Sequence, residues 1–281
     1  MNSLLSKYKP AIILTLALAV FLTSCKLPTT TPDRSWVVST FAGAVAKFNG
    51  PHGVAVDSSG NLYVADRHNH RIRKITSAGE LSTFAGSKQG DKNGTGTRAQ
   101  FNNPTGVAVD SSGNLYVADT GNYLIRKITP GGVVSTLAGT GTAGSADTNA
   151  ATGTRAQFNN PTGVAVDSSG NVYVADESTH RIRKITPAGV VSTLLARQFN
   201  WPTGVAVDSS GNVYVGDTWT HTIRKITPGR VVTTIAGTGS GGDYDGTGTA
   251  AQFTYPEGVA VDSSGILYVA DTDNHTIRKI E

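Results

Sequence analysis

Two side chains with acid–base chemistry occupy the same position of a short repeated phrase. His52 and Glu257 each lie between a proline and a glycine, where the other three copies of the phrase have threonine. An imidazole and a carboxylate can serve as general base and general acid. A catalytic zinc needs three protein ligands, so His52 and Glu257 alone do not predict a metal site, and we expect no cofactor.

Aromatic side chains also interrupt the repetition. Trp201 and Tyr255 directly precede the proline of their copies, where two other copies have asparagine. Aromatic rings beside a few polar groups suit a binding site for a ligand, peptide or glycan. A residue present in every copy is expected to build the fold, and one that differs is a site candidate. The ligand-binding candidates are Trp201, Trp219, Tyr244, Tyr255, Glu257, His52 and His68; no residue is assigned as catalytic.

The repeated unit predicts short β-strands. Its phrase P-x-G-V-A-V-D-S-S-G starts at Pro51, Pro104, Pro161, Pro202 and Pro256, and its aspartates lie 53, 57, 41 and 54 residues apart. Spacings of this size indicate a repeat architecture. Alternating β-branched residues between Gly, Asn, Asp and Pro turns predict four antiparallel strands per unit.

The words GVAVDSSGNLYVADTGN, NHRIRKI and VSTLAG closely resemble NHL repeats over residues 36–281. This resemblance implies an all-β fold, a β-propeller with one four-stranded blade per repeat. The fifth unit ends after its third strand, and residues 36–43 (WVVSTFAG) match the missing fourth. We therefore expect five blades closed by an N-terminal strand, with no open blade edge. The alternative is the six-bladed ring that is usual for this family.

All variation in unit length falls in the loop that leads to the next unit. These loops have 17, 21, 5 and 18 residues (87–103, 140–160, 197–201 and 238–255). In a propeller they share one face with the loop between the second and third strands. One face is thus expected to vary and to carry the site, while the DSSGN turns form a nearly invariant face.

The repeated charged residues are expected to be structural. Asp57 and its equivalents start a tight turn, and Asp66 and its equivalents tie the following loop to backbone amides. The strands of type RIRK hold 12 of the 24 Lys and Arg residues, which we expect to be solvated or salt-bridged. Acidic loop phrases such as 243–246 lack the oxygen ligands and distal Glu of a calcium loop. Without residues 1–24 the chain carries 22 Lys and Arg against 20 Asp and Glu, too even a balance to predict a nucleic-acid partner.

The N-terminus has the pattern of an export signal. Two lysines precede a 12-residue apolar run, which is too short for a stable membrane span. The phrase Leu22-Thr23-Ser24-Cys25 resembles the lipobox of bacterial lipoproteins, which implies lipidation of Cys25, the only cysteine. The expected organisation is a signal peptide (1–24), a tether (25–35) and the propeller (36–281), exported and lipid-anchored to the bacterial cell envelope.

These observations together predict an extracytoplasmic interaction module. It would bind an unidentified protein, peptide or glycan on its variable face and contact the membrane through lipidated Cys25. The alternative is a propeller enzyme of lyase or lactonase type that acts at the mouth of the central channel. The sequence favours the binding module, because no Ser-His-Asp or Cys-His arrangement can be recognised.

Overall fold

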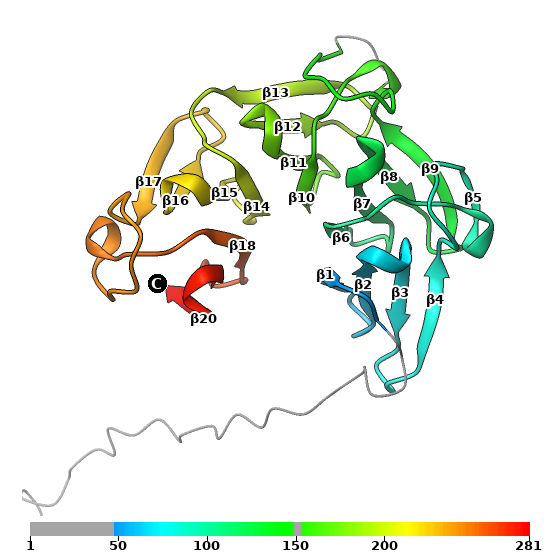
Figure 1. Cartoon of the computed structure of the whole chain (residues 1–281), viewed down its shortest axis with the longest axis horizontal. Helices are drawn as coiled ribbons and strands as arrows, with labels where there is room; N and C mark the ends of the chain where they lie inside the picture. The colour runs from blue at the N-terminus through cyan, green and yellow to red at the C-terminus, as the bar shows by residue number, and fades with distance from the viewer. Residues whose placement is uncertain (1–47, 149–152) are drawn as a thin grey trace, which may run out of the picture. The chain divides into compact units, whose positions relative to one another are not determined.

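The computed structural model describes residues 48–148 and 153–281. The predicted signal peptide, the tether and the closing strand 36–43 lie outside these ranges. The described chain folds into five antiparallel β-sheets, one per repeat, arranged as the blades of a propeller (Figure 1). The all-β prediction with five blades is confirmed. None of the helices in the two described ranges is long and apolar enough to cross a membrane.

Each blade runs outward from an inner strand that begins at or near the proline of the repeated phrase. The strands of blades one to three are β1 (Pro51–Val56), β2 (Leu62–Asp66), β3 (Arg71–Ile75) and β4 (Leu81–Ala85); β6 (Val107–Val109), β7 (Leu115–Asp119), β8 (Leu124–Ile128) and β9 (Val133–Ala138); and β10 (Pro161–Val166), β11 (Val172–Asp176), β12 (Arg181–Ile185) and β13 (Val191–Ala196). Those of blades four and five are β14 (Pro202–Val207), β15 (Val213–Asp217), β16 (Thr222–Ile226) and β17 (Val232–Ala236); and β18 (Pro256–Val261), β19 (Leu267–Asp271) and β20 (Thr276–Ile280).

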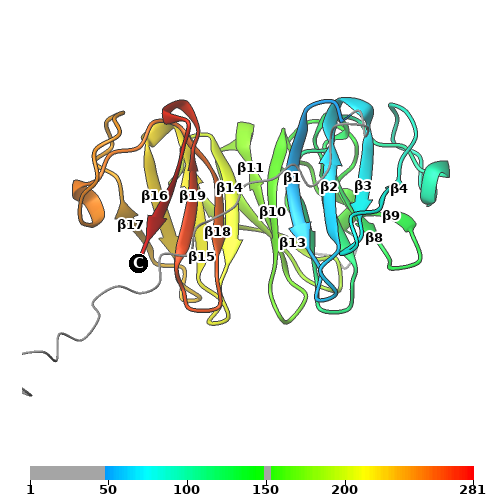
Figure 2. The same cartoon turned by 90° about the horizontal axis from the view of Figure 1, so that it is seen from below.

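Short 3-10 helices mark one end of the blades. Pro51 pairs with Asp66, so the start of the inner strand and the end of the second strand lie at the same end. Figure 2 shows the helices at this end and the hairpin turns at the other. We name the helical end the η face. Its inner helices are η1 (Arg67–Asn69), η3 (Thr120–Asn122), η5 (Glu177–Thr179), η6 (Thr218–Thr220) and η8 (Thr272–Asn274).

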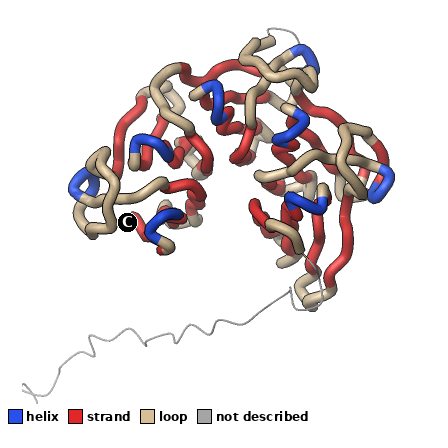
Figure 3. Tube along the Cα trace, in the orientation of Figure 1, coloured by secondary structure: helices blue, strands red, loops and turns tan. Residues whose placement is uncertain are grey.

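Three further helices lie at the outer edge: η2 (Gly96–Arg98), η4 (Gly153–Arg155) and η7 (Gly248–Ala250) (Figure 3). They belong to the long loops between blades. The loop into blade two also forms β5 (Gly94–Thr95), which pairs with β9 as a fifth strand. In the loop into blade three, the Thr148 amide donates to the Val191 carbonyl of β13. The long loops therefore cover the outer strands, whose free edges would otherwise invite pairing with other chains.

The turns of the opposite face follow the predicted aspartate chemistry. In blade one, Asp57 Oδ1 accepts hydrogen bonds from the amides of Ser59 and Asn61 at 2.9 Å each. Asp57 Oδ2 accepts from the Tyr63 hydroxyl at 3.2 Å. The carboxylate thus replaces a backbone acceptor and fixes the turn. Hydrogen bonds to the charged form also lower the pKa of Asp57, although burial opposes them.

Neighbouring blades pack through one repeated set of apolar side chains. Between blades one and two this cluster contains Tyr63, Ala65, Ile72, Val107, Leu115, Val117 and Ile128. The corresponding residues form the clusters between blades two and three and between blades three and four. Burying each large apolar side chain contributes about 1.5–3 kcal/mol, so blade stacking is the main apolar interaction of the fold.

Blades one and five each have a face without such cover among the described residues. Ile277 of blade five is 72% exposed, whereas its equivalent Ile125 is fully buried. Val54 of blade one is 56% exposed, against 7% for Val107. Among the strands that the structure describes, β20 is the outer edge of a three-stranded sheet. Closure by residues 36–43 therefore stays a prediction.

A buried aspartate–arginine pair holds each blade together. In blade two, Arg126 Nη1 donates to Asp119 Oδ2 at 2.7 Å, and both side chains are fully buried. Asp119 Oδ1 accepts the amide of Asn102 in the incoming loop at 2.7 Å. Burial raises the pKa of Asp119, and these two partners limit the rise. The equivalent pairs are Asp66–Arg73, Asp176–Arg183, Asp217–Arg224 and Asp271–Arg278.

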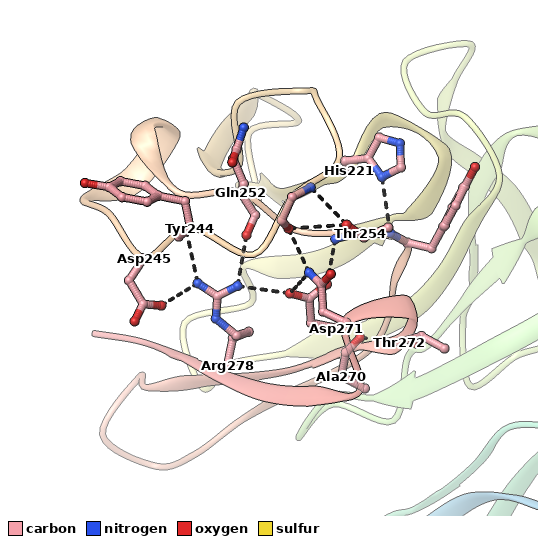
Figure 4. Close-up of polar contacts among 12 residues, drawn as sticks. His221, Tyr244, Asp245, Gln252, Thr254, Ala270, Asp271, Thr272 and Arg278 are labelled. Atoms are coloured by element: carbon pink, nitrogen blue, oxygen red, sulfur yellow. Dashed lines mark hydrogen bonds and ion pairs between the residues drawn. The ribbon is translucent and has the colours of Figure 1, made fainter.

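The same arginines bind the long loops (Figure 4). Arg278 Nη2 donates to Asp245 at 2.6 Å, and Arg278 Nη1 donates to the Gln252 carbonyl at 2.9 Å. Asn93 and Asp147 take the place of Asp245 in blades two and three. The acidic loop phrases are therefore loop anchors. In blade four, which follows the five-residue loop, Arg224 Nη1 donates to the Gln198 carbonyl of that loop at 3.2 Å, and no loop side chain binds Arg224 among the described contacts.

We expect Arg126→Ala to lower the free energy of unfolding by about 3–5 kcal/mol, because it leaves the buried Asp119 carboxylate without its cation. Arg224→Ala is the matched control. Arg224 is 20% exposed, and among the described contacts it binds a loop carbonyl but no loop side chain, so its loss should cost less than half as much. Urea denaturation of both variants measures the difference. Equal losses would contradict the role given to the loop and to burial.

Candidate functional site

The inner strands surround a cavity of about 670 Å³ that all five blades line. Two sets of side chains face it at the η end. The first set stands between the proline and glycine of each inner strand: His52, Thr105, Thr162, Thr203 and Glu257. The second set begins the inner helices and contains Arg67, Thr120, Glu177 and Thr272. A cavity of this size suits a small ligand.

In blades two and four, the threonine of the inner strand hydrogen-bonds to the threonine that begins the inner helix. Thr105 and Thr120 hydroxyls lie 2.6 Å apart, and Thr203 and Thr218 hydroxyls lie 2.7 Å apart. The Thr105 hydroxyl also donates to the carbonyl of Thr162 in the next blade at 3.1 Å. These contacts join neighbouring inner strands without any charged group. The charged residues at the same positions in other blades are therefore not needed to build the propeller.

Four ionisable side chains replace these threonines. Blade one contributes His52 and Arg67, blade three Glu177, and blade five Glu257. We name these four residues the mouth cluster. The structure thus brings together the two predicted residues His52 and Glu257 in one cavity. It adds Arg67 and Glu177, which the sequence analysis missed.

The carboxyl groups of the mouth cluster are poised to hold a proton. Burial raises the pKa of Glu177 to about 7, and the negative charge of Glu257 adds to this rise. The hydrogen bond from Asn160 Nδ2 at 2.7 Å and the positive charge of Arg67 oppose it. Burial also raises the pKa of Glu257, with a further contribution from Asp273.

His52 is biased toward its neutral form. Burial lowers its pKa, and the positive charge of Arg67 lowers it further, while a hydrogen bond to the Thr105 backbone opposes both. A neutral imidazole that lines the same cavity as carboxyl groups with a raised pKa can accept a proton near neutral pH. The mouth cluster therefore combines proton acceptors, a proton donor and one fixed positive charge.

A second feature of the η face is a row of aromatic rings across blades three to five. Trp201 and Trp219 have ring centroids 6.4 Å apart, and Trp219 and Tyr255 have centroids 5.4 Å apart. His180 and His221 flank the row at 5.6 and 4.7 Å. We name Trp201, Trp219 and Tyr255 the aromatic strip. Trp201 is 40% and Trp219 56% exposed.

The histidines of the repeat hold the chain that carries the strip. His180 Nδ1 accepts the amide of Trp201 at 3.1 Å, and His221 Nδ1 accepts the amide of Tyr255 at 3.2 Å. His70 does the same for Asn103. The repeated histidine therefore has a structural role in these blades.

Two residues of the strip have an unusual backbone conformation. Trp201 and Tyr255 have φ of 53° and 50°, in the left-handed region. The equivalent residues in other blades are Gly50, Asn103 and Asn160, which adopt this region readily. A bulky aromatic residue there is strained by about 1 kcal/mol or more. Because the blades fold with glycine or asparagine, these rings do not serve local stability.

The two remaining sequence candidates lie elsewhere. Tyr244 is 66% exposed and belongs to the long loop on the outer side of blade five, where its carbonyl accepts from Arg278 (Figure 4). His68 lies in η1 beside Gly50, and its amide donates to Asn49. Neither residue lines the cavity described above, and neither makes a ring contact with the aromatic strip among the described residues.

Arg67 and Glu177 had a signal in the sequence. The first residue after each Y-V-A-D or Y-V-G-D phrase reads Arg67, Thr120, Glu177, Thr218 and Thr272. Comparing the copies at this position would have singled out both charged residues. Among the described residues, no group of three or more His, Cys, Asp or Glu side chains could hold a metal ion.

Glu177→Gln is expected to stabilise the protein more at about pH 8 than at about pH 5. The pKa of Glu177 is raised on folding, so wild-type stability falls as pH rises from about 4.5 to about 7. Partial exposure screens the effect, which should be on the order of 1 kcal/mol. Thermal unfolding across this pH range measures it, with the exposed Glu80→Gln as control. A pH-independent difference would contradict the environment described for Glu177.

Comparisons with known proteins agree with this geometry. The NHL repeat model matches residues 48–75, 101–128, 158–185, 199–226 and 253–280. NHL repeat-containing protein 2 of Homo sapiens is 34% identical over 142 residues, which cover 47% of this chain and 19% of that protein. This chain therefore matches less than a fifth of that relative's length.

Two solved structures share the fold. One, described as a nidogen/laminin complex, has a TM-score of 0.62 at 19% identity, covering 82% of this chain and 75% of the other. A streptogramin B lyase has a TM-score of 0.56 at 17% identity, covering 82% and 64%. At these identities the likeness concerns the fold alone. With five matched repeats in five blades, the chain belongs to the NHL-repeat proteins and folds as a β-propeller.

Proposed function

We propose that this propeller is an exported, lipid-anchored binding module that holds a protein, peptide or glycan on its η face. The observation that carries the proposal is the aromatic strip. Trp201 and Tyr255 keep a strained backbone where other blades have asparagine or glycine, and the exposed tryptophan rings are available to a ligand. Strain that the fold does not require is typical of functional positions.

The chemistry of the strip suits binding. Tryptophan and tyrosine present large, stiff, amphipathic surfaces, and they are frequent hot spots of interfaces. Lys and Arg side chains stack on nine other aromatic rings of the described chain, including Phe101 and Tyr116. No such cation contact is found on Trp201, Trp219 or Tyr255 among the described residues. The cations of the described chain therefore do not occupy these rings, and Trp201 and Trp219 keep 40% and 56% of their surface exposed to an external partner.

The proposed location rests on the N-terminal pattern. The apolar run and the lipobox-like phrase that ends at Cys25 support export followed by lipidation. Two or three acyl chains would anchor the protein stably, because each buried CH₂ contributes about 0.8 kcal/mol. An envelope location supports a protein, peptide or glycan partner and gives no support for a nucleic acid.

We expect Cys25→Ser to abolish lipidation, because the thiol is the group that would be acylated. The variant should accumulate as an uncleaved precursor or outside the membrane fraction. Fractionation and mass spectrometry of the N-terminus in a bacterial host measure both outcomes. Retention of Cys25→Ser in the membrane at the wild-type level would contradict the proposed anchor.

The binding role is tested by giving blades four and five the residues of blade three. The variants are Trp201→Asn, Trp219→Ser and Tyr255→Asn, after Asn160 and Ser178. We expect an affinity loss of about thirtyfold or more for a partner cross-linked in the envelope. Melting temperatures should stay equal or rise, because asparagine tolerates the left-handed backbone.

Lys127→Gln and Lys184→Gln serve as controls. These lysines stack on tyrosines whose hydroxyls bind the turn aspartates of the face opposite the η face. The two variants should change binding weakly and mainly at low salt. If the lysine variants lose the partner and the strip variants keep it, the η face is not the binding face.

The second candidate function is catalysis at the channel mouth, of lyase or lactonase type. The mouth cluster favours it, since a neutral His52 and carboxyl groups with raised pKa could exchange protons with a bound substrate. The resemblance in fold to a streptogramin B lyase adds only the architecture. Turnover that is lost in His52→Ala would favour the enzyme over the binding module.

A further inference from the structure

The mouth cluster separates opposite charges across one cavity. Arg67 comes from blade one, while Glu177 and Glu257 come from blades three and five. Each glutamate interacts with the positive charge of Arg67. Yet the cluster forms no salt bridge within 4.0 Å among the described residues. The charges are close enough to influence one another and too far apart to neutralise one another directly.

Arg67 lacks the partners that other arginines of the fold have. Its Nε is buried without a hydrogen-bond acceptor, and no hydrogen bond of its guanidinium is found among the described residues. Arg126 and Arg183 also leave Nε unpaired, but their terminal nitrogens bind carboxylates, an amide oxygen and carbonyls. A guanidinium that lines a cavity and has free donors suits a carboxylate ligand, which it can bind in a bidentate manner.

Glu177 and Glu257, in turn, lack a positively charged partner in contact among the described residues. Glu177 accepts one hydrogen bond from the neutral Asn160 amide, and the side-chain donor that favours the charged form of Glu257 is the neutral Thr272 hydroxyl. Neither donor carries a positive charge, so both partly buried carboxylates lack a cation in contact. An ammonium group placed between them would relieve their repulsion and supply several charge-assisted hydrogen bonds.

We propose that the channel mouth binds a small zwitterion, an amino acid or similar ammonium carboxylate, with its carboxylate on Arg67 and its ammonium between Glu177 and Glu257. The cavity of about 670 Å³ accepts a molecule of this size with water. The threonine hydroxyls of the inner strands complete a polar wall. This site differs from the aromatic strip and does not depend on it.

Binding of the ammonium requires ionised glutamates, so affinity should depend on pH. Glu177 faces Glu257, Arg67 and Asn160, while Glu257 also faces Asp273 and Thr272. Because the pKa of Glu177 is about 7 in the free protein, raising the pH from about 6 to about 8 should strengthen binding and reduce the proton release that accompanies it. His52 lines the same cavity, and burial together with the positive charge of Arg67 lowers its pKa and favours its neutral form.

The test uses four probes with the same five-carbon chain: 5-aminopentanoate, 1,5-diaminopentane, glutarate and 1,5-pentanediol. Isothermal titration of the full chain should show saturable binding of 5-aminopentanoate, at least about tenfold tighter than each other probe. Equal or tighter binding of the diamine or of glutarate would overturn the proposal, as would no saturable binding of 5-aminopentanoate.

Substitution by the threonine of other blades keeps the fold and removes one charge at a time. Arg67→Thr, Glu177→Thr and Glu257→Thr should each weaken 5-aminopentanoate binding by about tenfold or more. Arg67→Thr should also abolish the preference over the diamine. Glu80→Gln and Lys88→Gln remove one exposed charge of each sign outside the cavity and should leave binding unchanged.

Melting curves of the three threonine variants confirm that each is folded before titration. Wild-type affinity in all three would overturn the proposal. Trp219→Ser should keep probe binding, so failure of the aromatic strip and failure of the mouth cluster are told apart.

Discussion

The buried aspartate–arginine pair is the interaction on which each blade depends. The aspartate at the end of the second strand accepts the amide of the incoming loop on one oxygen and the arginine of the third strand on the other. In blades two and three, and again in blade five, the arginine then reaches a side chain of the long loop. One ion pair thus fixes two strands and the loop from the preceding blade. A buried pair of this kind is costly to break because either partner alone is a buried charge.

This arrangement explains how loop length can vary without disturbing the site. The loop of 21 residues and the loop of five both end in an amide bound by the aspartate, at Asn159 and Asn200. In both copies the proline comes two residues after this amide, and the cavity-lining residue follows the proline. The inner strands therefore begin at equivalent points in each blade, and substitutions such as Glu257 enter the cavity without rebuilding the blade.

Much of the fold could be predicted from the sequence, because strand alternation and turn residues act locally. The aspartate turns, the five blades and the variable face follow from such local patterns. The burial of Arg126 and Arg183 could not be read from the RIRK and LIRK strands, since it depends on partners 7 to 37 residues away. The strip was predicted in part, because its aromatic residues visibly break the repeat in the sequence. The left-handed backbone of Trp201 could be seen only in the structure. Arg67 and Glu177 were missed because they meet His52 and Glu257 only around the cavity.

Among the described residues, blades one and five each have a neighbouring blade on one side only, and this has a consequence for how the described part of the molecule opens. In a chain of stacked repeats, each repeat is held mainly by its nearest neighbours, and terminal repeats loosen first. Blade four has described neighbours on both sides, so its two tryptophans belong to a part of the molecule that unfolds locally less readily. The cavity, in contrast, is lined by Arg67 and His52 of blade one and by Glu257 of blade five. Transient detachment of blade one or blade five would remove residues from the cavity while leaving the paired tryptophans in place. A molecule bound in the cavity would contact both of these blades and so oppose their detachment.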